Sequence, residues 1–189
     1  MISTADFPLD RKRPGARDRR IGEMLRVDHA GEHGAVKIYS GQRAVFDALP
    51  GKAAIAEKLR EMEDGEVEHL NTFNRLLAER GVRPTLLSPI WSVAGFGLGA
   101  ATALMGVKAA MACTAAVEEV IEKHYAGQAE LLDEADPSLA QTVRAFREDE
   151  LAHKATAEAH GALEAPGYGV LKAAIQAGCR LAIRLAEKV

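Results

Sequence analysis

Residues 59–77 read LREMEDGEVEHLNTFNRLL, and this stretch decides the fold. Its apolar residues recur every three or four positions, which is the spacing of one face of an α-helix with about 3.6 residues per turn. Glu66 and His69 interrupt the apolar stripe, and because they are three residues apart they project from the same face of the helix. An unpaired carboxylate on a core-facing stripe is strongly destabilising, so this pair needs a partner or a metal ion.

The same pair of polar residues occurs a second time. Residues 139–157 also have an apolar stripe, which Glu150 and His153 interrupt at the same spacing. One Glu-x-x-His on a solvated helix is weak evidence, whereas two of them on the apolar stripes of two helices indicate a shared metal site. The alternative is a metal-free core with Glu–His hydrogen bonds, which leaves the repeated spacing as a coincidence.

The rest of the chain is also patterned for helices. Its prolines fall between long proline-free runs, and the alternation of β-branched residues that is typical of strands is nearly absent. We predict an all-α protein, a bundle of long antiparallel helices joined by short loops. The expected helices cover residues 19–48, 52–80, 90–106, 108–134, 137–162 and 168–188. They form a single domain over residues 19–189, after a flexible leader of residues 1–18.

The composition excludes several classes of protein. The chain has 189 residues, of which 48% are apolar and 27% charged, which is enough for one globular domain with its own core. A net charge of −3 provides no basic surface for a nucleic acid. The two cysteines, Cys113 and Cys179, are too few for a disulfide scaffold and lie in Ala-rich stretches, so we expect buried, reduced thiols.

Two further helices supply the remaining carboxylates of a di-metal site, which needs one glutamate from each. The first predicted helix offers Glu32 on its apolar stripe. In the fourth, Glu118 and Glu122 are both candidates, and the pattern favours Glu118, with Glu122 as a competing choice or a carboxylate beside the ligands. Hard oxygen ligands with two imidazoles suit iron or manganese better than copper, and the lack of cysteine ligands excludes a Cys-type zinc site.

At these residues the sequence resembles the demethoxyubiquinone hydroxylase family of ubiquinone biosynthesis, within the ferritin-like superfamily. The resemblance is carried by RVDHAGEHGA (26–35), ACTAAVEEVIEKHY (112–125) and the two Glu-x-x-His pairs, and it extends from about residue 19 to the C-terminus. It implies a ferritin-like four-helix bundle, and it selects Glu118 as the fourth carboxylate. The implied iron ligands are Glu32, Glu66, His69, Glu118, Glu150 and His153.

The resemblance also implies an activity. The expected enzyme is a di-iron monooxygenase that hydroxylates the ring of a polyprenylated demethoxybenzoquinol in ubiquinone biosynthesis. Its cofactors are two iron ions, with O₂ as co-substrate and NADH or another external reductant as electron source. Tyr125 is expected to form a hydrogen bond beside the ligands or relay a proton, although core packing explains it equally well. The alternatives are a ferritin-like iron-binding protein or ferroxidase, and a non-catalytic scaffold of the ubiquinone pathway.

An apolar stretch bears on the location of the protein. Residues 86–117 contain one charged residue, Lys108, and residues 86–107 contain none. This is long enough for a membrane span, which needs about 20 residues. Pro89 and four glycines argue against a span, however, and so does the following helix, which must return Glu118 to the metal site. We expect two additional helices to form an apolar, membrane-docking element. The alternative is burial at an oligomer interface.

This element predicts the partners and the location of the protein. We expect a peripheral protein on the cytoplasmic face of the inner membrane of a bacterium, or on the mitochondrial inner membrane of a eukaryote. The expected partners are the polyprenyl benzoquinol, the membrane surface, other proteins of ubiquinone biosynthesis and further copies of the same chain, and no nucleic acid is expected.

Overall fold

The computed structural model describes residues 15–188, and in this range it contains helices and no strand. The helices are α1 (Ala16–Phe46), α2 (Ala53–Arg80), α3 (Ser88–Leu104), α4 (Val107–Ala135), α5 (Pro137–Ala159), the short 3₁₀-helix η1 (Ala162–Glu164) and α6 (Tyr168–Ala186). The all-α prediction is therefore confirmed, and each of the six predicted helices is present.

The first helix begins earlier than expected. α1 starts at Ala16, three residues before the predicted start, because Asp18 accepts a hydrogen bond from the backbone N–H of Gly15 and caps the helix. Residues 1–14 of the predicted leader lie outside the described residues. The division into a leader and a single domain stays a prediction.

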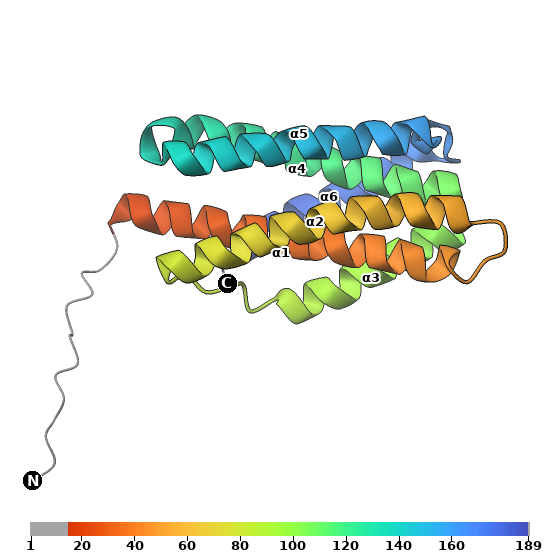
Figure 1. The fold of residues 1–189 in the computed structure, drawn as a ribbon, viewed down its shortest axis with the longest axis horizontal. Coiled ribbons are helices and arrows are strands. Elements are labelled where there is room, and N and C mark those ends of the chain that lie inside the picture. The colour runs from red at the N-terminus through yellow and green to blue at the C-terminus, as the bar shows by residue number, and fades with distance from the viewer. Residues whose placement is uncertain (1–14, 189) are drawn as a thin grey trace, which may run out of the picture.

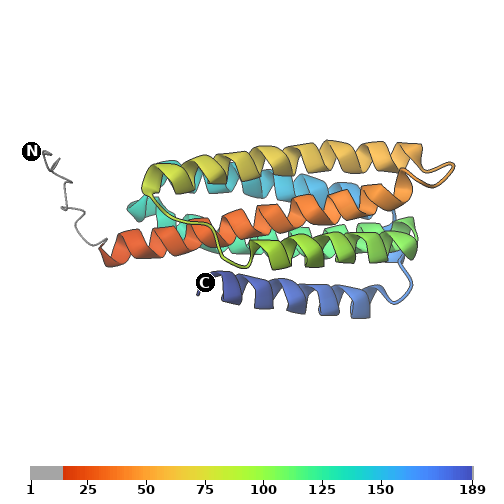
Figure 2. The same cartoon turned by 90° about the horizontal axis from the view of Figure 1, so that it is seen from below.

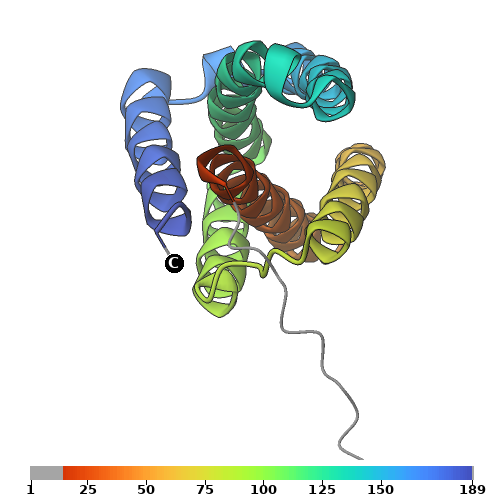
Figure 3. The same cartoon turned by 90° about the vertical axis from the view of Figure 1, so that its left-hand side faces the viewer.

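Four long helices form the bundle. α1 and α2 make one hairpin, α4 and α5 make a second, and the two hairpins face each other (Figures 1 and 3). α3 packs against α1 and α6 packs against α4, so both lie outside the four (Figure 3). They run along the same side of the bundle (Figure 2).

Glycines bring α3 unusually close to α1. A Cβ atom at Gly99 would lie 2.0 Å from the main-chain oxygen of Ile38, and a Cβ atom at Gly41 would lie 2.2 Å from that of Phe96. The two helix backbones can approach this closely only because these positions have no side chain. Two of the four glycines in residues 86–107, Gly95 and Gly99, therefore allow a regular helix to pack closely on α1. Among the described residues, none of the helices has both the length and the apolar character that a membrane crossing needs.

The core of the bundle has two apolar parts with a polar layer between them. One part contains Tyr39, Leu59 and Met111, and the other contains Phe73 and Leu132. Along α1, α2, α4 and α5 the predicted ligands lie between a residue of one part and a residue of the other. The periodicity of the four helices directs the polar residues inward, and the axial register of the helices brings them to one level of the bundle.

The two cysteines differ in their surroundings. Both are free thiols; Cys113 is buried, whereas Cys179 on α6 is partly exposed. Burial raises the pKa of Cys113 to about 12 and that of Cys179 to about 11, so both stay protonated at neutral pH. Full burial was predicted for both and is wrong for Cys179, because this residue lines a cavity beside α6.

Candidate metal centre

The structure brings the six predicted ligands together in the polar layer. Their donor atoms form two groups, each with all its atoms within 4.8 Å of one another. The His69 group consists of Glu32, Glu66, His69 and Glu150, and the His153 group consists of Glu66, Glu118, Glu150 and His153. Glu66 and Glu150 belong to both groups, which is the arrangement expected for two neighbouring cations that share two carboxylates.

The four glutamates are almost completely excluded from solvent. Each has a relative exposure of 1% or less. In each of them at least one carboxylate oxygen is buried without a hydrogen-bond partner, and so is the Nδ1 atom of His69. Buried groups in this state are strongly destabilising unless a cation satisfies them. The donor set of carboxylates and imidazoles fits two iron ions, and a core of Glu–His hydrogen bonds alone leaves these atoms unsatisfied.

The protonation of the ligands also indicates a site that attracts positive charge. Burial, together with the charge of Glu66, raises the pKa of Glu32 well above its usual range, and burial with the charge of Glu150 does the same for Glu118. Burial opposes ionisation of Glu66 as well, but hydrogen bonds with His153 and His69 lower its pKa to about 2. Glu32 and Glu118 therefore favour the protonated form, whereas the neighbouring histidines keep Glu66 ionised.

The pKa values of the two histidines are also raised. Burial disfavours a charged imidazole, yet the nearby carboxylate of Glu150 and the hydrogen bond with Glu66 raise the pKa of His153 to about 9. His69 also has a raised pKa, because the nearby carboxylates of Glu150 and Glu32 outweigh its burial. Each ring nitrogen that faces the centre thus holds a proton that a metal ion would displace.

A residue of α5 fixes the orientation of His69. The Nε2 atom of His69 lies 3.1 Å from Oδ2 of Asp149, while its Nδ1 atom faces Glu150 at 3.4 Å and Glu32 at 3.6 Å. Phe146 stacks on the imidazole with ring centroids 3.9 Å apart. The sequence reasoning missed Asp149; its position directly before Glu150 is the one signal that points to it.

His153 is held differently. Its Nδ1 atom lies 2.9 Å from Oε1 of Glu66. The position before Glu66, equivalent to Asp149 in the other hairpin, is Gly65, and a Cβ atom there would lie 3.4 Å from the Nε2 atom of His153. Each hairpin thus provides a carboxylate that contacts the histidine of the other, but the Nε2 atom of His69 faces Asp149, whereas that of His153 faces Gly65.

Two buried tyrosines contact the ligands. The hydroxyl of Tyr125 donates a hydrogen bond to Oε1 of Glu32, as expected for a residue beside the ligands. Tyr39, for which no role beside the ligands was predicted, donates to Oε1 of Glu118 at 2.6 Å. Its spacing was the available signal, because Tyr39 follows Glu32 by seven residues, as Tyr125 follows Glu118.

The competing candidate Glu122 and the buried histidine His29 of α1 lie outside the two groups. The carboxylate of Glu122 faces Arg147 of α5 at 3.5 Å. His29 lies with its Nε2 atom 3.0 Å from Oδ1 of Asn74 on α2. Neither residue contributes to the two groups of donor atoms.

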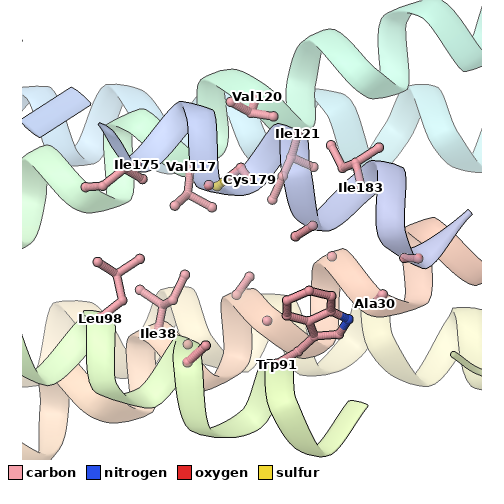
Figure 4. Close-up of a pocket in the computed structure, with 18 of the residues that line it drawn as sticks. Ala30, Ile38, Trp91, Leu98, Val117, Val120, Ile121, Ile175, Cys179 and Ile183 are labelled. Atoms are coloured by element: carbon pink, nitrogen blue, oxygen red, sulfur yellow. The ribbon is translucent and has the colours of Figure 1, made fainter. Parts of the chain in front are cut away.

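A large apolar cavity lies beside the centre, between α1, α3, α4 and α6. Its volume is about 520 Å³, and none of its lining residues is charged. Figure 4 shows Trp91 and Leu98 of α3 facing Ile183 and Ile175 of α6 across it. On α4 the lining includes Val117, which directly precedes Glu118. The cavity therefore extends from the two outer helices to the helices that carry the predicted ligands.

The chain was compared with known proteins. A model of the family described as ubiquinone biosynthesis protein COQ7 matches residues 19–186. The chain is 52% identical over 169 residues to a 3-demethoxyubiquinol 3-hydroxylase of Rhodospirillum rubrum, covering 89% of this chain and 78% of the relative. It is 48% identical over 173 residues to a mitochondrial NADPH-dependent 3-demethoxyubiquinone 3-hydroxylase of Homo sapiens, with the same coverage.

A more distant relative matches over a similar span. The chain is 41% identical over 184 residues to a mitochondrial 5-demethoxyubiquinone hydroxylase of Saccharomyces cerevisiae, covering 89% of this chain and 78% of the relative. The resemblance carried by residues 26–35 and 112–125 is thus confirmed: the chain belongs to the ubiquinone biosynthesis protein COQ7 family.

Proposed function

We propose that this protein is a di-iron monooxygenase that hydroxylates the ring of a polyprenylated demethoxybenzoquinol with O₂ in ubiquinone biosynthesis. The observation that carries the proposal is the layer of four glutamates and two histidines, in which the glutamates and His69 have buried donor atoms without a partner. Its relatives are named demethoxyubiquinol or demethoxyubiquinone hydroxylases.

The ligand residues would hold two iron ions. The His69 group is suited to one ion and the His153 group to the other, with Glu66 and Glu150 common to both. When bound, iron supplies the redox chemistry with O₂ that no side chain of the protein provides. The residues of the chain exclude water from this layer, and Asp149 sets the orientation of His69.

The apolar cavity is suited to the substrate. A polyprenyl benzoquinol combines a long apolar tail with a small polar ring, and a cavity of this size without charged lining residues can bury the tail. Gly31 and Val117 line the cavity and adjoin Glu32 and Glu118 in the sequence. A ring bound at these residues would therefore contact the two helices that carry Glu32 and Glu118.

The two outer helices support docking on a membrane. α3 exposes Val93 and Leu104, with relative exposures of 76% and 75%, and α6 exposes Leu181. α6 also carries Arg180 and Arg184, so it combines apolar and basic faces as interfacial helices do. Since the cavity lies between these two helices, a polyprenyl chain can pass from lipid into the cavity without crossing water.

Membrane binding is tested by flotation with vesicles of phosphatidylcholine and phosphatidylglycerol. Val93→Asp is expected to lower the bound fraction about tenfold, because burial of a large apolar side chain contributes roughly 1.5–3 kcal/mol. Val67→Asp, on the exposed part of α2, is the matched control and should bind as the unmodified chain does. Equal binding by all three proteins would contradict docking through α3.

Relatives named NADPH-dependent support a reduced nicotinamide as external electron source. The names also place relatives in a bacterium and in mitochondria. Attachment to the corresponding inner membrane, contacts with other proteins of the pathway and a homo-oligomer remain part of the proposal.

The activity is tested by supplying the iron-loaded protein with a short-tailed demethoxyubiquinol, NADH and O₂. The expected product carries one additional ring hydroxyl, and its oxygen atom derives from O₂. A ferritin-like protein with the same ligands would oxidise iron and leave the quinol unchanged. Bound iron without quinol turnover in the presence of reductant would therefore contradict the hydroxylase.

A further inference from the structure

Tyr39 and Tyr125 form a reciprocal pair across the two hairpins. Each follows a predicted ligand of its own helix by seven residues, or two helical turns: Tyr39 follows Glu32, and Tyr125 follows Glu118. The hydroxyl of Tyr39 donates to Glu118 at 2.6 Å, and the hydroxyl of Tyr125 donates to Glu32. Each tyrosine thus serves the glutamate of the opposite helix.

These bonds leave one oxygen of each glutamate for the centre. In both Glu32 and Glu118 the Oε1 atom accepts the tyrosine hydrogen bond, while the Oε2 atom is buried without a partner. Glu32 belongs only to the His69 group and Glu118 only to the His153 group. A tyrosine that fixes one of these glutamates therefore acts on one metal position and not on the other.

We propose that Tyr39 and Tyr125 are positioning residues, each responsible for one metal position: Tyr39 for the His153 group through Glu118, and Tyr125 for the His69 group through Glu32. The inference rests on the proposed di-iron function. A hydroxyl that donates to one carboxylate oxygen restricts rotation of the carboxylate and keeps the other oxygen directed to the metal. Because each of these hydrogen bonds crosses between the hairpins, each also links α1 to α4.

A purely structural role makes a different prediction. Tyr39 lies in an apolar cluster with Phe46 and Met111, and the ring of Tyr125 stacks on Phe73 with centroids 6.3 Å apart. Replacement by phenylalanine keeps the ring and removes only the hydroxyl. If packing were the whole role, metal affinity would not depend on which tyrosine is replaced.

The test is a Co²⁺ titration of the full chain, followed by the visible absorption of the bound metal. The unmodified chain is expected to bind two Co²⁺ ions. Tyr39→Phe and Tyr125→Phe should each weaken one of the two ions 10–100-fold, the usual effect of removing a partner of a metal ligand. Tyr168→Phe, which alters the third tyrosine of the chain on α6, is the control and should leave both affinities unchanged.

A histidine variant then identifies the position affected. In a His69→Ala background, which leaves the His153 group intact, Tyr39→Phe should weaken Co²⁺ binding 10–100-fold and Tyr125→Phe should have no effect. In a His153→Ala background the two tyrosine variants should exchange roles. Equal effects in both backgrounds, or no effect in either, would overturn the assignment.

Two controls keep the result interpretable. The tyrosines lie in different apolar clusters, so if one variant fails to fold by circular dichroism, the other still decides the question. An unmodified chain that binds no Co²⁺ would contradict the di-iron function itself. If the unmodified chain binds two ions and the tyrosine variants bind them equally well, only the positioning role is contradicted.

Discussion

Asp149 of α5 holds His69 of α2 through a contact of 3.1 Å between Oδ2 and Nε2. The backbones of α2 and α5 make few direct contacts, so this pair is one of the connections that close the two hairpins around the polar layer. It also directs the Nδ1 atom of His69 toward Glu32 and Glu150. The same contact thus links the packing of the bundle to the geometry of the site.

Asp149→Ala is expected to weaken the metal position of the His69 group about 10–100-fold, because the imidazole loses the partner that sets its orientation. The stability of the metal-free protein should change little, since the side chain of Asp149 is 59% exposed. Co²⁺ titration and thermal unfolding measure the two effects. Asp133→Ala removes an equally exposed aspartate that pairs with Arg144, and it should leave metal binding unchanged. Similar losses in both variants would argue against the orienting role.

Two glycines of α3 are expected to respond oppositely to alanine. At Gly99 a Cβ atom would lie 2.0 Å from the carbonyl oxygen of Ile38, so Gly99→Ala must push α3 away from α1 and should lower the free energy of unfolding by about 1–3 kcal/mol or more. At Gly97 no atom lies within 4 Å of the added Cβ, and Gly97→Ala should raise the free energy of unfolding by about 0.5–1 kcal/mol. Urea denaturation measures both. Equal changes in the two variants would contradict the close packing of α1 and α3.

The metal-free protein should lose stability as the pH rises. The pKa of His153 is raised to about 9 from a usual value of about 6.5, so its stabilising charge is fully present below about pH 6.5 and disappears as the pH passes 9. Glu32 and Glu118, whose pKa burial raises, act in the same direction. The melting temperature of chelator-treated protein is therefore expected to be lower at pH 9.5 than at pH 6.5.

Metal affinity should follow the opposite trend over the same range, because a metal ion must displace the proton of His153. His153→Gln removes this titrating group and should flatten the dependence of melting temperature on pH. A metal-free protein that became more stable between pH 6.5 and 9.5 would contradict the charge arrangement of the site.

Ala182→Trp is expected to fill part of the apolar cavity, because Ala182 lines it from α6. The KM for a quinol with a polyprenyl tail should rise about tenfold or more, while a tailless quinol should be converted as before and the iron content should not change. Ala177→Trp places the same bulk on the exposed side of α6 and is the control. If both substrates were affected equally, the cavity would not be the site of the tail.

Much of the site follows from the sequence because it depends on local periodicity. Spacing within one helix is enough to place Glu66 with His69 and Glu150 with His153 on inward faces, and the resemblance chose Glu118. Contacts between helices depend on their axial register, which a single sequence does not specify. For this reason the bonds of Tyr39 to Glu118 and of Asp149 to His69 were not predicted.

The outer helices illustrate the same limit. The apolar stretch was recognised, but its glycines were interpreted only as evidence against a membrane span, whereas Gly99 allows α3 to pack closely on α1. The cavity between α3 and α6 likewise arises from the placement of whole helices and has no signature in either segment alone.

The iron content of the purified chain tests the central claim most directly. The unmodified protein is expected to bind two iron ions per chain, because the His69 and His153 groups each provide one position. Glu150→Ala, which removes a ligand common to both, should bind fewer than one, whereas Glu148→Ala, two residues earlier on the same helix and exposed, should bind two. A Glu150→Ala protein that retained two irons, or an unmodified protein that bound none, would contradict the account.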